Sequence, residues 1–166
     1  MKTTEAAERA LDIINNLGGT AEQFRKNWLT IHAFSSEFDC GDIRSSLVNA
    51  VSSSISDKSA QAILTSLSSE IAYLKSNPVG NLQFSSSDTR FYRNAKQDIA
   101  QATLQCRGAP NRLGHLVCVV YQVRCNTEHG RKKLGTARSQ ELFRVCNRIM
   151  EFVIPELVAS SGSKQQ

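Results

Sequence analysis

The chain has 166 residues, 40% of them hydrophobic, and a formal net charge of +5 at pH 7. This length suits one domain that buries enough surface to fold without a metal or a disulfide. No hydrophobic run approaches the ~20 residues of a membrane span, and the acidic residues near the N-terminus are untypical of a secretory signal. Because the five cysteines lack framework spacing, we expect a soluble intracellular protein.

The first half of the chain predicts helices. Apolar residues recur at helical spacing over 3–17, and two glycines follow. A second helix should begin at Thr20 and end near residue 34. A third should run over about 42–53, and a fourth from Asp57 to the residues before Asn77, which precedes a proline and so disfavours helix.

The second half predicts two further helices around a segment of uncertain type. One helix should begin near residue 87 or 88 and end near 105. The run LVCVVYQV at 116–123 is rich in β-branched residues and predicts either a short strand or a buried helix, because periodicity does not separate the two. The last helix should occupy about 137–157.

These elements together predict an all-α fold. We expect an antiparallel four-helix bundle with extra N-terminal helices and a possible short β segment near 116–123. Residues 1–158 should form a single helical domain. The tail at 159–166, ASSGSKQQ, is expected to be disordered.

Positive charge is concentrated in one part of the chain. Residues 90–148 contain twelve Lys and Arg but three acidic residues, whereas residues 1–89 contain seven basic and ten acidic ones. Such asymmetry favours a polyanionic partner, most often nucleic acid. If the last two long helices pack antiparallel, the basic turns and loops should meet at one end of the bundle. The candidate RNA-binding residues are Arg90, Arg93, Arg107, Arg112, Arg131, Lys132, Lys133 and Arg138.

Residues that could bind a metal or carry out catalysis are few. His115, Cys118, Cys125 and His129 have the donor types of a zinc site, but the six-residue gap between the cysteines matches no known ligand knuckle. We therefore interpret them as structural residues and predict no bound metal and no cofactor. The sequence contains no P-loop, GxGxxG, GxSxG or HExxH motif. An enzyme is accordingly not expected.

Three segments resemble a known family. FSSSDTRFYRN, which begins at Phe84, is similar to the F-x-x-S-D-x-x-x-Y-R segment of tobacco mosaic virus-like coat proteins, the subunits of rod-shaped plant viruses. Asn111-Arg112 is similar to an Asn-Arg pair of that family, and the last helix resembles the family's at Arg138, Ile154, Glu156, Leu157 and Gly162. The resemblance spans about residues 28–162.

The resemblance implies a helical viral capsid subunit that packages single-stranded RNA and self-associates into a filament. It implies that Arg112 and Arg138 contact phosphates, and that the protein is found in the virion or the host cytoplasm. Two alternatives remain open from the sequence. One is a non-filament helical RNA-binding protein, such as a viral silencing suppressor, and the other is a protein-interaction module.

Overall fold

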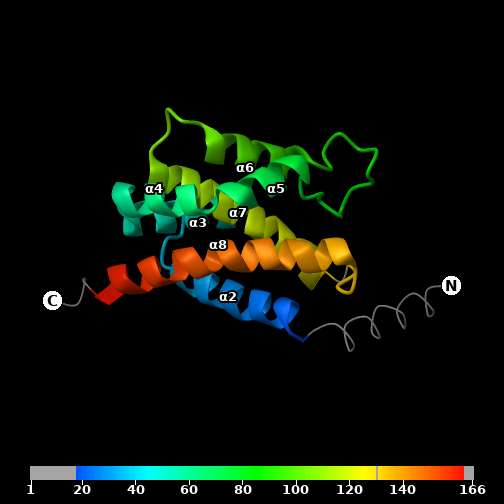
Figure 1. The fold of residues 1–166 in the computed structure, drawn as a ribbon, viewed down its shortest axis with the longest axis horizontal. Coiled ribbons are helices and arrows are strands. Elements are labelled where there is room, and N and C mark those ends of the chain that lie inside the picture. Colours follow the sequence, from blue (N-terminus) through cyan, green and yellow to red (C-terminus); the bar gives the residue numbers. More distant parts are fainter. Residues whose placement is uncertain (1–17, 130, 163–166) are drawn as a thin grey trace.

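The computed structural model describes residues 18–129 and 131–162, and all regular elements in these ranges are helices. Figure 1 shows their arrangement. The all-α class predicted from the sequence is confirmed. The predicted helix at 3–17 lies outside the described residues. The elements are α2 (Thr20–Ser35), α3 (Ile43–Ser54), α4 (Asp57–Ser66), α5 (Ser68–Ser76), α6 (Arg93–Thr103), α7 (Ala109–Glu128) and α8 (Ala137–Gly162).

The helix α7 lies at the centre of the fold. Helices α3, α4, α6 and α8 all pack against it, and α2 packs mainly against α8. Both α3 and α6 run antiparallel to α7, as does α8, which follows it after a short connection. None of the helices in the described ranges is long and apolar enough to cross a membrane.

The helices α2 and α8 run parallel, which differs from a uniformly antiparallel bundle. The Thr20 hydroxyl donates to Gln140 Oε1 at 2.8 Å. Seven residues further along both helices, Asn27 Nδ2 donates to Asn147 Oδ1 at 3.2 Å. Short connections force neighbouring helices to be antiparallel. Since α2 and α8 come from opposite ends of the chain, no short connection fixes their relative direction.

The segment 116–123 is part of α7, so the strand alternative is wrong. Side chains from Leu116 to Val120 are at most 1% exposed, because other helices cover α7 on several sides. A helix buried all round has no polar stripe, which is why its sequence showed no helical periodicity. The helix begins after Gly108, with Pro110 in its first turn, where a missing N–H costs nothing.

Local sequence determines where several helices begin. The Asp42 carboxylate caps α3 by accepting from the Ser45 amide at 2.9 Å, and the Ser56 hydroxyl caps α4. The single helix predicted from residue 57 is divided at Leu67, whose backbone leaves helical geometry. Serines flank this position, and their hydroxyls compete for backbone partners in helices.

Two other predicted boundaries are wrong. Residues 85–91 form consecutive turns, so α6 begins at Arg93 and not at residue 87 or 88. The Phe91 ring packs so closely on Gly80 that a Cβ there would lie 2.2 Å from it, which fixes this loop against the end of α5. At the other end, α8 continues through residues 159–162, which were predicted to be disordered. Residues 163–166 lie outside the described residues.

Candidate nucleic-acid interface and polar cleft

The eight basic candidates fall into two groups at opposite ends of the fold. A helix of 20 residues spans about 30 Å at 1.5 Å per residue, and α7 is such a helix. Its N-terminal end carries Arg112 and follows Arg107, whereas residues 131–138 follow its C-terminal end (Figure 1). The expectation that both groups meet at one end is therefore wrong. It assumed that the helix near 87–105 and the last helix pack antiparallel, whereas α6 packs mainly against α7, and the two groups lie at opposite ends of α7.

One end of the fold collects most of the candidates, and we call it the basic end. It comprises the loop 77–92, the start of α6, the end of α7, residues 131–136 and the first turn of α8. Asn126 connects these segments, because its side-chain amide donates to Gly80 O at 2.7 Å and its oxygen accepts from Leu82 N at 3.1 Å. Its carbonyl accepts from Arg131 N at 3.3 Å.

The exposed cations at the basic end include Arg93, Arg131, Lys133 and Arg138. Within residues 18–129 and 131–162, none of the four forms an ion pair with a carboxylate. Arg138 donates to the Pro78 carbonyl oxygen at 3.2 Å, which positions its guanidinium beside the loop 77–92. These four side chains can offer donors to an anion at little desolvation cost.

The other two candidates at this end are less available. Arg90 pairs with the Asp88 carboxylate at 2.7 Å and lies over the Phe84 ring at 4.2 Å. This partner lowers the pKa of Asp88 to about 2, so the pair persists at ordinary pH. Lys132 is half-buried, and burial lowers the pKa of its ammonium.

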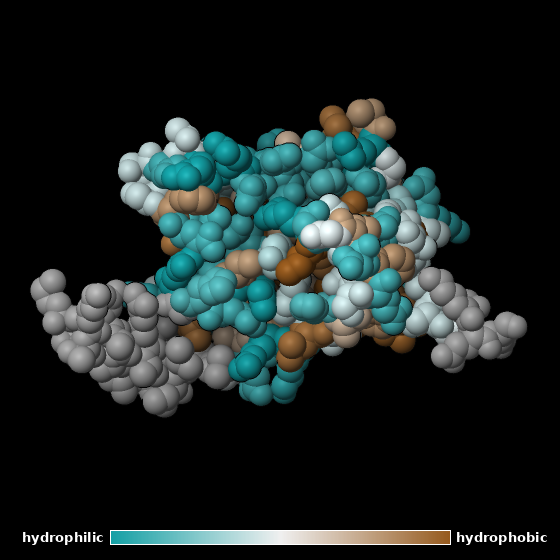
Figure 2. All heavy atoms as spheres, turned by 180° about the vertical axis from the view of Figure 1, so that it is seen from behind, coloured by the Kyte–Doolittle hydropathy of each residue, from teal (hydrophilic) through white to brown (hydrophobic). Residues whose placement is uncertain are grey.

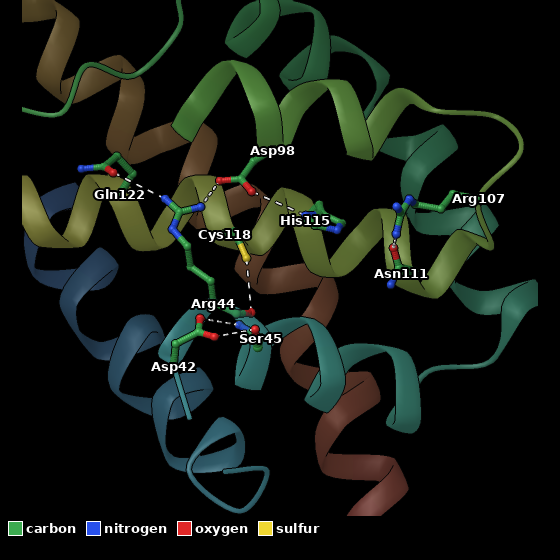
Figure 3. Close-up of polar contacts among 9 residues, drawn as sticks. All are labelled: Asp42, Arg44, Ser45, Asp98, Arg107, Asn111, His115, Cys118 and Gln122. Carbon is green, nitrogen blue, oxygen red and sulfur yellow. Dashed lines mark hydrogen bonds and ion pairs between the residues drawn. The ribbon is translucent and has the colours of Figure 1, made fainter. Parts of the chain in front are cut away.

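At the opposite end, Arg112 has a structural role. It is 7% exposed, and its Nε donates to the Ala102 carbonyl oxygen at 3.0 Å, which joins the end of α6 to the start of α7. The predicted phosphate contact of Arg112 therefore conflicts with its burial. Arg107 is exposed and donates to Asn111 Oδ1 at 2.9 Å (Figure 3).

A polar cleft of about 570 Å³ lies between α3, α6 and α7. Its lining is rich in amide and hydroxyl side chains, with one ionised cluster at its base (Figure 3). The Arg44 guanidinium contacts the Asp98 carboxylate and donates to Gln122 Oε1 at 3.4 Å. On the other side of this carboxylate, His115 Nδ1 lies 3.5 Å from Asp98 Oδ1.

Cys118 lies next to this cluster and is buried. Its thiol donates to the Arg44 carbonyl oxygen at 3.6 Å. Burial, followed by the negative charge of Asp98, raises the pKa of Cys118 to about 12. The thiol is therefore protonated at neutral pH, and it is not an activated nucleophile.

The four zinc-type residues of the sequence do not converge. Cys125 is seven residues beyond Cys118 on α7, and His129 is eleven beyond it, so they lie about 10 and 16 Å along the helix axis. The structure instead adds Asp98 to His115 and Cys118, with all three ligand atoms within 4.8 Å of one another. Asp98 could not be recognised from the spacing of the candidates, because it belongs to α6 and precedes His115 by seventeen residues.

No family model matches the chain, and no significant match was found among curated proteins or solved structures. The resemblance to rod-shaped virus coat proteins therefore stays a prediction.

Proposed function

We propose that the chain is a structural protein that binds single-stranded RNA at its basic end. The observation that carries the proposal is the grouping of Arg93, Arg131, Lys133 and Arg138, all exposed and without a carboxylate partner in the described ranges. Four such cations on segments at one end of the fold can each neutralise a phosphate of a nucleic acid.

The mechanism of such binding is electrostatic. Each cation that neutralises a phosphate releases counterions, so affinity falls with salt and is largely independent of sequence. Base recognition has little support at this end, since Tyr92 is half-buried between the Phe91 ring, 4.6 Å away, and the Lys96 ammonium, 5.5 Å away. Backbone contacts of this kind position a protein on RNA without reading its bases.

The role of capsid subunit rests on the sequence resemblance and requires self-association. Within residues 18–129 and 131–162, four large hydrophobic side chains are exposed: Leu29, Ile43, Leu104 and Val158. They lie on different segments, and Figure 2 shows the hydrophobic residues of the back face as separate spots among hydrophilic ones. Because scattered hydrophobic residues are normal on monomers, this surface favours the second candidate, a non-filament RNA-binding protein that uses the same basic end.

The test of RNA binding is a comparison of two double variants with equal loss of charge. Arg131→Ala/Arg138→Ala removes two cations from the basic end, and Lys58→Ala/Arg107→Ala removes two exposed cations from the opposite end. Affinity for a fluorescent single-stranded RNA is measured by anisotropy over a salt series. Since single strands give a slope of about 0.7 per phosphate contact, the first variant should lower the slope by roughly 1.4, and the control should leave it nearly unchanged.

Equal effects of the two double variants would contradict the basic-end assignment, because only net charge would then matter. Circular dichroism of both variants checks that the fold is retained, since Arg138 also bonds the loop 77–92. Negative-stain electron microscopy with and without RNA separates the two candidates. Rods whose length depends on RNA indicate a capsid subunit, and small uniform particles indicate a non-filament binder.

A further inference from the structure

The cleft between α3, α6 and α7 holds three different metal-ligand types at its base. Asp98 belongs to α6, and His115 and Cys118 are three residues apart on α7, so both face the same side of that helix. A carboxylate, an imidazole and a thiol together form a donor set that is typical of zinc. Their three ligand atoms all lie within 4.8 Å of one another.

The distance between two of these donors suits a shared ion better than a direct bond. His115 Nδ1 and Asp98 Oδ1 are 3.5 Å apart, which is beyond the usual range for a hydrogen bond. Zinc binds nitrogen and oxygen at about 2.0–2.1 Å. In a tetrahedron with such bonds, neighbouring ligands are about 3.3 Å apart. The observed separation is therefore close to that of two ligands on one zinc ion.

The surroundings of Asp98 match those of a metal-binding carboxylate. Arg44 contacts Oδ2, which leaves Oδ1 directed at His115, and the same guanidinium is held by Gln122 at 3.4 Å. Carboxylates that bind metals are commonly oriented by such outer hydrogen bonds. Arg44 would thus fix one oxygen while the other binds the ion (Figure 3).

The cleft supplies the open side of the site. With a volume of about 570 Å³, it gives access to His115 from solvent, and Asn94 and Asn111 also line it. Three protein ligands and one position open to water or a small anion is the arrangement of accessible zinc sites. We propose that Asp98, His115 and Cys118 form a zinc-binding site that links α6 to α7, with its fourth position facing the cleft. This site is independent of RNA binding at the basic end.

The test uses the full chain and zinc alone. Zinc is removed with a chelator, and binding is measured by isothermal titration calorimetry, with metal analysis of the reloaded protein. We expect one zinc per chain. Cys118→Ser and His115→Gln should each weaken binding by at least about tenfold, as the loss of even an outer partner often does. The matched controls are Cys125→Ser, in the last turn of α7, and His129→Gln, directly after α7. They change the same residue types and should bind zinc as the wild type does.

Two outcomes would overturn the site: no stoichiometric zinc in the wild-type chain, or equal losses in the variants and the controls. Because a change at the buried Cys118 could disturb folding, cobalt(II) provides a second measurement on the unmodified protein. A cobalt-bound thiolate gives a charge-transfer absorption in the near ultraviolet. Its appearance at one equivalent supports the assignment of Cys118, and its absence rejects it. Zinc should also raise the melting temperature in proportion to the logarithm of its concentration.

Discussion

The close approach of α3 and α7 at Gly114 leads to a quantitative prediction. A Cβ atom added at Gly114 would lie 2.8 Å from Val48 Cα and 3.2 Å from Val48 O. Both atoms belong to the backbone of α3, so a side-chain rotation cannot relieve the contact. The helix would have to move by several tenths of an ångström, and Leu47 and Val51, which are buried in the core, would move with it.

Two opposing effects determine the result of Gly114→Ala. Overpacking of a filled core costs about 1–3 kcal/mol, whereas alanine in place of glycine within a helix gains about 0.8–1.0 kcal/mol. The net expectation is a loss of about 1 kcal/mol in the free energy of unfolding. For a domain of this size, such a loss lowers the melting temperature by roughly 2–4 °C.

The assay is urea unfolding followed by far-ultraviolet circular dichroism, with the midpoint and the slope fitted together. Gly162→Ala is the matched control, because a Cβ there meets nothing within 4 Å, and it should stay within about 0.5 kcal/mol of the wild type. Val48→Ala added to Gly114→Ala should give no rescue, since the obstructing atoms are backbone. A Gly114→Ala protein at least as stable as the wild type would refute the reasoning, and so would clear rescue by Val48→Ala.

Three further predictions concern buried amides, a helix cap and an ion pair. Asn147→Ala leaves the buried Asn27 Nδ2 without its acceptor and should cost about 2 kcal/mol in urea unfolding; an unchanged midpoint would contradict it. Asp42→Ala removes the cap of α3 and should cost about 1 kcal/mol at pH 7. Hydrogen bonds from the Ser45 hydroxyl and then from the Ser45 amide lower the pKa of Asp42, so this cost should shrink as pH falls from about 4 through the lower folded-state pKa, and a cost that grows in acid would disprove it. Asp88→Asn should free Arg90 and tighten RNA binding in the anisotropy assay, and weaker binding would count against the basic end.

Features fixed by local sequence could be predicted. The region of the α3 start followed from the helical spacing of Ile43, Leu47 and Val51. The inward residues of α4, such as Ala60 and Leu64, followed from helical spacing, because α4 has one buried face. In both cases the residues that decide the structure are neighbours in the chain.

Features that depend on tertiary packing could not be predicted. The segment 116–123 is a helix that other helices cover. A helix buried on all sides lacks the alternation of apolar and polar faces by which a sequence indicates a helix. The assumption that the last two long helices pack against each other misplaced Arg107 and Arg112 relative to residues 131–136, because α6 packs mainly against α7. At the polar cleft, Asp98 and His115 come together through the antiparallel packing of α6 on α7. A contact between two helices cannot be predicted from residue spacing within one segment.

The parallel pairing of α2 and α8 has a consequence for protein synthesis. Thr20 and Gln140, which are hydrogen-bonded in the fold, are 120 residues apart. At 5–20 residues per second, a ribosome needs about 6–24 s to make the chain between them. During that interval α8 is not yet available to pack against Phe24 and Trp28, which are both buried in the finished fold. Each nascent chain therefore exposes the apolar face of α2 until α8 has been synthesised. A chain truncated before α8 would leave this face of α2 permanently exposed.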